Sequence, residues 1–250
     1  MEKFRGRVAV VTGASSGIGA QLAEDLVRAG LVVVGVARRR ERLEALASSL
    51  SGLDGRLEVL QADLSSVDEV KRVFKWIDES LGGVTVLVNN AAICPITPTQ
   101  DQELGVIESA VATNLTAMMV GSNLAVNNMK RFNIKDGHII NINSVAGHKI
   151  MYSPGQDASV TTYTTTKHGA VAFSNALRFD VQRIHGFKIR VTSLSPGTVR
   201  TEMTSKWVEQ LPKDRVLDPK DVSNAALYVL SCPTTVEISE LTIQPQGESF

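Results

Sequence analysis

The pair Tyr163 and Lys167 is the feature of this sequence best suited to acid–base chemistry. The two residues stand four positions apart in an amphipathic segment, so on a helix they would share one face, about 5–6 Å apart at Cβ. A phenol has a pKa of about 10, and a neighbouring ammonium favours its ionised form. Because a chain of this composition is expected to hold roughly 0.1 such pairs by chance, the spacing needs support from its surroundings.

Two polar residues upstream of this pair supply part of that support. Ser144 stands at the end of the fifth predicted strand, and Asn114 lies within the long helical segment before it. Each also has a plain structural explanation, because Ser144 could cap the strand end and Asn114 could tether a strand through its amide. Residue type and position leave both alternatives open.

A glycine-rich turn follows the first predicted strand and opens the first predicted helix, with the sequence Gly13-Ala14-Ser15-Ser16-Gly17-Ile18-Gly19. Its backbone could approach a pyrophosphate at the positive end of the helix. The spacing G-x-x-x-G-x-G is neither the G-x-G-x-x-G fingerprint nor a P-loop, and tight packing alone is the competing explanation. The turn also fits the G-x-S-x-G nucleophile elbow, but it follows the very first strand and therefore lacks the upstream loop that completes an oxyanion hole.

The end of the second predicted strand indicates which dinucleotide would bind. An NAD site places an acid about 20 residues after the glycines, whereas this chain has Ala37 followed by Arg38 and Arg39. A guanidinium fits a 2′-phosphate, so the sequence favours NADP. The alternative is that these arginines begin a solvated helix. Asp63, just after the third strand, is either a helix cap or an acceptor for the adenine amino group.

The elements that must position these residues alternate along the chain. Short apolar runs, several of them apolar on both faces, alternate with longer amphipathic segments, which is typical of parallel strands covered by helices. We expect an α/β fold with a Rossmann-like, doubly wound parallel sheet of about seven strands in three α/β/α layers. A single domain is expected over residues 1–250, with substrate loops at 145–160 and 197–215. The predicted strands are 7–12, 31–37, 56–61, 84–89, 138–143, 188–195 and 241–244, and the predicted helices are 17–29, 40–50, 66–80, 102–130, 159–185 and 219–230.

Composition excludes several classes of function. The 250 residues carry 26 Lys and Arg against 26 Asp and Glu, so no net charge holds nucleic acid or an acidic membrane surface. Cys94 and Cys232 have no Cys-x-x-Cys partner and the histidines have no ligand spacing, so we expect free thiols and no metal. Residues 8–11 are too short for a signal peptide, and no stretch approaches the roughly 18 apolar residues of a membrane span. The expected location is cytoplasmic.

Taken together, these motifs resemble the short-chain dehydrogenase/reductase superfamily, and within it the insect NADP-dependent farnesol dehydrogenase-like group. The resemblance covers nearly every predicted element. It is carried by Thr12-Gly13-x-x-x-Gly17-Ile18-Gly19, Asn89-Asn90-Ala91, Asn114, Ser144, Tyr163-x-x-x-Lys167 and Pro196-Gly197.

The resemblance implies a role for each of these residues. Tyr163 would be the general acid or base, Lys167 would hold the nicotinamide ribose and favour the phenolate, Ser144 would donate to the substrate oxygen, and Asn114 would fix a water that relays a proton. Thr201 would reach the pyrophosphate, with an N-cap as its structural alternative. The remaining cofactor contacts would be Gly13, Ser15, Ser16, Gly17, Ile18, Gly19, Arg38, Arg39, Asp63, Leu64, Asn90, Ala91, Pro196, Gly197 and Val199.

The substrate implied is a small lipophilic alcohol or carbonyl compound, because the loops around the expected nicotinamide position are mainly apolar. An isoprenoid alcohol such as farnesol is the first expectation, steroid or general carbonyl reduction is the second, and a catalytically silent NADP sensor or scaffold is the non-enzyme alternative. Segments 102–130 and 159–185 resemble helices that pair subunits in this family, so a homodimer or homotetramer is expected. The expected substrate contacts are Ser144, Val145, Tyr152, Met203 and Trp207.

Two departures from the family pattern stand out. Ala92 replaces a glycine that usually follows Asn-Asn-Ala. The 19-residue step from Ser144 to Tyr163 exceeds the family's common spacing, so residues 148–159 are expected to form an extra loop beside the substrate. Tyr152 in that loop is a poor rival base, because Gln156 stands where a lysine would be needed.

Overall fold

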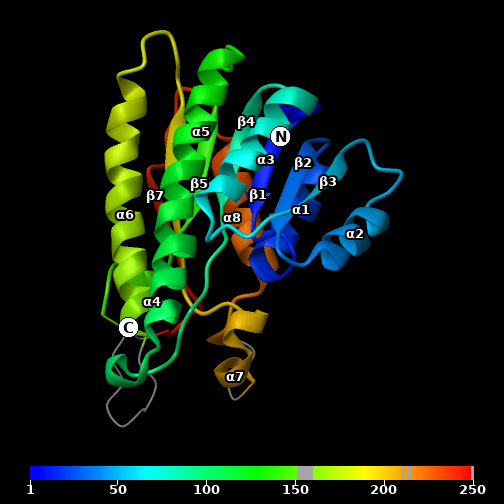
Figure 1. The fold of residues 1–250 in the computed structure, drawn as a ribbon. Helices are drawn as coiled ribbons and strands as arrows, with labels where there is room; N and C mark the ends of the chain where they lie inside the picture. The colour runs from blue at the N-terminus through cyan, green and yellow to red at the C-terminus, as the bar shows by residue number, and fades with distance from the viewer. Residues whose placement is uncertain (151–159, 210, 213–214, 249–250) are drawn as a thin grey trace.

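The fold is a seven-stranded, fully parallel sheet between two layers of helices (Figure 1). It is seen in a computed structural model that describes residues 1–150, 160–209, 211–212 and 215–248, with Trp207 described by its backbone only. The strand order is β3-β2-β1-β4-β5-β6-β7, so the order reverses between β1 and β4. The strands are β1 Val8–Thr12, β2 Val32–Ala37, β3 Arg56–Gln61, β4 Val84–Asn89, β5 His138–Ile142, β6 Arg190–Pro196 and β7 Glu240–Ile243.

Helices connect the strands at nearly every step. The α-helices are α1 Gly17–Arg28, α2 Arg40–Ser49, α3 Val67–Ser80, α4 Leu104–Val111, α5 Ala117–Arg131, α6 Thr161–Gln182, α7 Ser205–Val208 and α8 Pro219–Ser231. Among the described residues, short 3-10 helices are η1 Glu2–Phe4, η2 Thr99–Asp101, η4 Val145–Gly147 and η5 Glu202–Thr204, and η3 Ala112–Thr116 is a π-helix. The predicted fold class is thereby confirmed, with strand and helix bounds that shift by a few residues.

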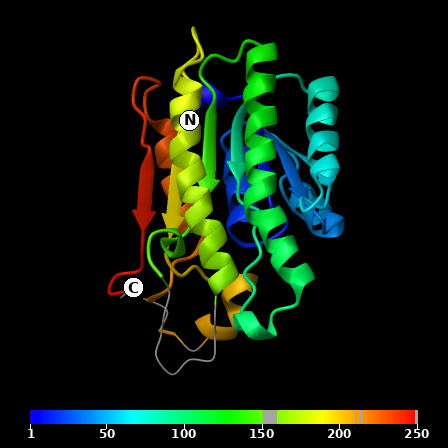
Figure 2. The ribbon, with the colours of Figure 1, turned by 60° about the vertical axis from the view of Figure 1, so that its left-hand side comes forward.

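Strands form where apolar residues occupy both faces of the sheet. All residues of β2 and β4 are buried, as the unbroken run Val32-Val33-Val34 requires. Two core clusters result. One packs α1 and α8 against one face of the sheet, and the other packs α3, α5 and α6 against the opposite face. Figure 2 shows α5 and α6 lying side by side across that second face, with the strands pointing toward the end of the molecule where α7 lies.

The predicted helix 102–130 is in fact three joined segments. Helix α4 continues through the π-turn η3 into α5, and Asn114 lies in the π-turn. By length and composition the whole stretch Leu104–Arg131 would suffice to cross a membrane, in contrast to the expectation that no stretch approaches a membrane span. Its α5 part packs on β4 and α3, so the sheet and its neighbouring helix account for one side of it.

The two expected substrate loops differ from the expectation in their local structure. Residues 145–147 form η4, and the segment after β6 contains η5 and α7. Thr201 caps η5 through a reciprocal hydrogen-bond pair with Thr204. Residues 151–159, which include Tyr152 and most of the expected extra loop, lie outside the described residues.

Candidate active site

A cleft of about 380 Å³ opens at the carboxyl ends of the strands, over the point where the strand order reverses. Such a position is the usual ligand site of an open parallel sheet. The residues that line it come from several separate segments of the chain between β1 and η5. They are Gly13, Ser15, Ser16, Gly17, Ile18, Ala37, Arg38, Arg39, Ala62, Asp63, Leu64, Asn90, Ala91, Ala92, Ile93, Thr113, Ile142, Asn143, Tyr163, Lys167, Thr201, Glu202 and Met203.

The glycine turn forms one wall of this cleft and packs closely. Gly13 and Gly17 have φ values of +69° and +54°, which residues other than glycine rarely adopt. A Cβ at Gly19 would lie 2.3 Å from the Gly13 carbonyl oxygen, so Gly19 serves the packing of the turn and is not among the lining residues. Asn90 secures the turn from the neighbouring strand, since its Nδ2 donates to the Thr12 carbonyl at 2.9 Å.

The start of helix α1 is open to an anion. Within the described part of the chain, Ser16 makes no side-chain capping bond and the first turn holds no acidic residue. Backbone N–H groups at a helix start attract phosphate through both hydrogen bonding and the helix dipole. The turn therefore fits the phosphates of a nucleotide.

Arg39 joins this turn to two other parts of the cleft. Its guanidinium donates to the hydroxyls of Ser15 at 3.3 Å and Ser16 at 2.8 Å, and it forms an ion pair with Glu202 at 2.7 Å. Arg38 also lines the cleft but is exposed. Asp63 is not a helix cap, because its carboxylate accepts from the backbone and hydroxyl of Ser65 while Ser66 caps α3. Those two bonds lower the pKa of Asp63.

Tyr163 and Lys167 lie one turn apart in the first part of α6, and both line the cleft. The Lys167 ammonium stands 5.6 Å from the centre of the Tyr163 ring and donates to the Ile142 carbonyl at the end of β5, at 2.7 Å. Lys167 is only 2% exposed, and burial lowers its pKa to about 8. Burial raises the pKa of Tyr163, opposed by a hydrogen bond with Ser144.

From the sequence, ionisation of the phenol near neutral pH was expected to need both the Lys167 cation and the oxidised nicotinamide. In the protein by itself, burial favours the neutral phenol. The physical reason is desolvation, which penalises the charged form of both side chains. Cys94 lies in the same neighbourhood, where burial raises the pKa of its thiol to about 11 and the Lys167 charge opposes the shift.

Ser144 and Asn114 do not line the cleft but hold residues that do. Ser144 begins η4 and accepts from the Ala146 backbone at 3.1 Å, so its hydroxyl serves as a cap as well as meeting Tyr163. The Asn114 amide is 1% exposed and ties down the backbone of Ile93 through both its oxygen and its nitrogen, at 2.8 and 2.9 Å. It also donates to Thr166 on α6, at 3.0 Å. The tethering alternative for Asn114 is therefore present in the structure.

Several residues that were expected to contact the cofactor or the substrate do not line the cleft. Among the described residues, Val145, Pro196, Gly197 and Val199 are absent from the lining of the cleft. Val145 and Val199 are buried, at 4% and 5% exposure, so as side chains they belong to the protein interior. Met203 does line the cleft. The side chain of Trp207 and all of Tyr152 lie outside what the structure describes.

Sequence reasoning missed groups whose role depends on tertiary contacts. The Thr12 hydroxyl accepts from the backbones of Asn90 and Ala91, which joins β1 to the segment after β4. Asn143 is anchored through its Nδ2 to Ser193 at 2.6 Å, while its buried Oδ1 has no partner among the described residues. Glu202 had no signal at all in the sequence, since its partner Arg39 is 163 residues away.

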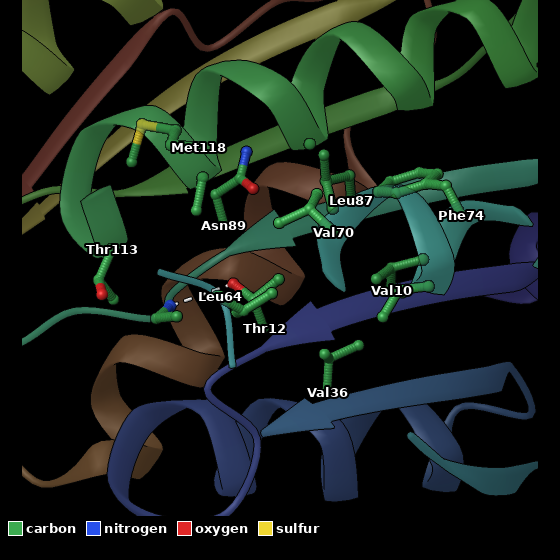
Figure 3. A pocket seen from close by; sticks show the side chains of 14 residues that line it. Val10, Thr12, Val36, Leu64, Val70, Phe74, Leu87, Asn89, Thr113 and Met118 are labelled. Carbon is green, nitrogen blue, oxygen red and sulfur yellow. Dashed lines mark hydrogen bonds between the residues drawn. The ribbon is translucent and has the colours of Figure 1, made fainter. Parts of the chain in front are cut away.

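A second cavity beneath the cleft is too small for a substrate. It measures about 20 Å³, which is room for one water molecule. Figure 3 shows its lining, with Asn89 and Thr113 at one end and apolar side chains such as Val10, Val70 and Phe74 around the rest. Among the described residues, no group of acidic, histidine or cysteine side chains could hold a metal.

Comparison with known proteins defines the class of protein that this fold and site represent. Residues 7–212 match the short chain dehydrogenase family. The chain belongs to the short-chain dehydrogenase family and is an oxidoreductase by that membership, as the motifs predicted.

Two sequence relatives and one solved structure show which members of the family the chain is similar to. The chain is 42% identical to farnesol dehydrogenase of Aedes aegypti over 252 residues, covering 100% of both chains. It is 35% identical to dehydrogenase/reductase SDR family member 11 of Homo sapiens, covering 98% of this chain and 96% of the relative. A crystal structure of actinorhodin polyketide ketoreductase with NADPH superposes with a TM-score of 0.81 at 27% identity, covering 96% of each chain. The likeness to the insect farnesol dehydrogenase-like group is confirmed.

Proposed function

We propose that this chain is an NADP-dependent oxidoreductase that moves a hydride between the nicotinamide and a lipophilic alcohol or carbonyl compound. The observation that carries the proposal is the convergence of three features on one cleft. The cleft is lined by Tyr163 and Lys167, by the glycine turn, and by Arg39, which donates to two serine hydroxyls of that turn.

The proposed mechanism assigns each side chain a step. When bound, the nicotinamide supplies or accepts the hydride. Tyr163 gives its phenolic proton to the substrate oxygen in reduction and takes it back in oxidation. Ser144 holds that oxygen through its hydroxyl, and Lys167 keeps positive charge beside the phenol. Asn114 steadies the Ile93 segment over the cleft and, as the family resemblance implies, a water on the proton path.

The direction of the pKa shifts bears on the reaction direction. Burial favours a neutral Tyr163, which is the form that donates a proton in carbonyl reduction. Oxidation needs the phenolate, which the positive charge of an oxidised nicotinamide would favour in addition to Lys167. Because a higher pH also favours the phenolate, we expect the rate of alcohol oxidation to increase more than the rate of reduction as the pH rises.

The preference for NADP over NAD rests on the end of β2. Ala37 stands where an NAD site has an acid, and Arg38 and Arg39 line the cleft just beyond it. Arg39 already shares its guanidinium with Ser15 and Ser16, which is a donor set suited to a phosphate monoester. The family includes solved members with NADPH, in agreement with this preference.

For the substrate we propose an isoprenoid alcohol such as farnesol. The support is the 42% identity to the Aedes aegypti farnesol dehydrogenase over the full chain. Ile93 and Met203 contribute apolar side chains to the lining of the cleft, which suits a lipophilic substrate. Steroids and other carbonyl compounds are the alternative substrates.

The experiment that tests the proposal follows NADPH absorbance with a panel of isoprenoid alcohols, steroid alcohols and short-chain alcohols. We expect turnover with NADP on the isoprenoid alcohols, faster than on short-chain alcohols and slower when NAD replaces NADP. Thermal stabilisation by NADP without turnover of any alcohol or carbonyl compound would instead identify a dinucleotide-binding sensor.

We also propose self-association and a cytoplasmic location. Only 28% of the apolar window within Leu104–Arg131 is buried, and Leu104, Val111 and Met119 on it are exposed, as is Phe179 on α6. A second copy of the chain packed on this face would cover these side chains. Light scattering that gives a dimer or tetramer, reduced to monomer by Met119→Glu, is the expected result. Both cysteines are free thiols, which agrees with a reducing compartment.

A further inference from the structure

Glu202 makes a contact across the cleft that the proposed mechanism does not use. It is the first residue of η5 and lies among the residues that line the cleft, on the side formed by the segment after β6. Its carboxylate accepts from Arg39 at 2.7 Å and forms a second ion pair with Arg42 of α2. The contact therefore joins the segment after β6 to the arginines that follow β2.

Arg39 is the shared member of two interactions at this place. One nitrogen faces the Glu202 carboxylate, while the others donate to the hydroxyls of Ser15 and Ser16 in the glycine turn. Two hydroxyls and a guanidinium on one side of a cleft make a set of donors for an anion. In the structure the anion that meets the Arg39 guanidinium is the Glu202 carboxylate, which contacts Nη1 while the serine hydroxyls contact Nε and Nη2.

A phosphate monoester and a carboxylate compete for the same kind of partner. Both accept paired hydrogen bonds from a guanidinium, and two anions held side by side repel each other. A 2′-phosphate that engages Arg39 would thus meet the negative charge of Glu202. Its two arginine partners lower the pKa of Glu202 to about 2, so the carboxylate is ionised throughout the neutral range.

We propose that Glu202 is a specificity-determining residue that occupies the anion position beside Arg39, and that the 2′-phosphate of NADP must displace it to bind. The proposal rests on the NADP preference stated above. Its consequence is that Glu202 weakens binding of nucleotides that carry a 2′-phosphate and leaves binding of those without one unaffected. Displacement also frees the first residue of η5, next to Met203, so cofactor binding and the substrate side of the cleft share one contact.

The test compares nucleotide binding by calorimetry in the full-length protein, with 2′,5′-ADP and NADP as probes that carry a 2′-phosphate and 5′-AMP and NAD as probes that lack it. We expect Glu202→Gln to tighten binding of both 2′-phosphorylated probes by about 3–5-fold, the size of one partly screened charge pair. The probes without a 2′-phosphate should bind within about twofold of their original affinity. The gain should vanish when Arg39 is also replaced by Ala.

The matched control is Glu44→Gln. Glu44 has the same 52% side-chain exposure as Glu202 and the same 2.7 Å contact with an arginine, Arg40, but it does not line the cleft. It should leave all four affinities unchanged. Thermal melting of both variants checks that they fold.

Each other outcome overturns a defined statement. Unchanged or weaker binding of 2′,5′-ADP by Glu202→Gln would mean that the carboxylate does not compete, or that it orients Arg39 for the phosphate, and would overturn the inference alone. Failure of the unaltered protein to bind 2′,5′-ADP and NADP would overturn both the inference and the proposed cofactor.

Discussion

The two ends of the sheet use the same kinds of side chain in opposite ways. At the carboxyl ends of the strands, Arg39, Tyr163 and Lys167 line an open cleft. At the amino ends, charged and amide side chains are bonded mainly to the protein itself. There Arg7 forms a paired contact with Asp136 at 2.8 Å, and Asn128 bonds to the Val84 backbone at 2.6 Å.

Arg190, at the start of β6, illustrates the amino end most clearly. It is 4% exposed and donates to the carbonyl of Val236 at 3.1 Å, with longer contacts to Cys232 and Pro233. Lys3 donates to the same Cys232 carbonyl at 2.6 Å. These cations hold the turn between α8 and β7.

The contrast between the two ends of the sheet separates polar residues that contribute to stability from those that can bind a ligand. A polar group whose bonds end on backbone at the amino ends contributes to stability, whereas one that lines the cleft is available to a ligand. Substitutions at the carboxyl ends should change binding or turnover with little loss of stability, and substitutions at the amino ends should do the reverse.

The sharpest test at the carboxyl end is Tyr163→Phe. We expect turnover to fall about 100-fold or more, because removal of the phenolic proton donor removes general acid–base catalysis. NADP affinity and the free energy of unfolding should stay close to those of the unaltered protein. Steady-state kinetics, calorimetry and urea unfolding measure the three quantities, and retained turnover would show that another group moves the proton.

Arg39→Ala should produce the next largest effect. We expect NADP to bind roughly 10–100-fold more weakly, since each hydrogen bond to a charged group contributes about 1.5–3 kcal/mol. NAD affinity should remain the same. Arg38→Ala is the matched comparison, and its smaller effect on NADP follows from the exposed position of Arg38. If Arg38→Ala has the larger effect on NADP affinity, the 2′-phosphate lies nearer Arg38 than the contacts of Arg39 indicate.

Asn128→Ala tests the amino end. Its amide oxygen accepts from the buried Val84 N–H, and its nitrogen donates to Asp78 and to the Gly82 carbonyl. Loss of these partners should lower the free energy of unfolding by about 1–3 kcal/mol without a change in NADP affinity. The adjacent Asn127→Ala is the control, because Asn127 is exposed and should stay within about 0.5 kcal/mol. An altered NADP affinity in Asn128→Ala would break the comparison between the two ends.

The smallest effect expected is on acid stability, through His138 at the start of β5. Its Nε2 contacts the Thr192 hydroxyl, which donates to the Ile238 carbonyl, so Nε2 carries the proton and the buried Nδ1 has no partner among the described residues. Burial, then the charges of Arg190 and Lys3, lower the pKa of His138 well below 6.5.

Because the unfolded chain binds a proton on His138 near pH 6.5 and the folded chain does not, stability present above that pH is lost as the pH falls below it. His138→Gln should therefore lose less stability than the unaltered protein between pH 7 and pH 5, by up to about 2 kcal/mol. Urea unfolding at the two pH values measures this, with the exposed His185→Gln as control. Equal acid sensitivity in all three proteins would place the acid-sensitive group elsewhere.

Much of the site was predictable because its signals are local. The glycine turn lies within seven residues, and Tyr163 and Lys167 are separated by one helical turn. The alternation of apolar runs and amphipathic segments predicts the parallel sheet, and a parallel sheet brings its carboxyl ends together. The position of the cleft followed from these local patterns.

The sequence by itself thus determined the fold class, the family and the helical face that carries Tyr163 and Lys167. Only the tertiary structure decided that Arg39 bonds Ser15, Ser16 and Glu202, that the Lys167 ammonium meets the Ile142 carbonyl, and that Asn114 ties down Ile93. The physical reason is that these bonds join segments distant in the chain, whose approach depends on the packing of whole layers. A periodic pattern along one segment records which face is buried, but not which partner it meets.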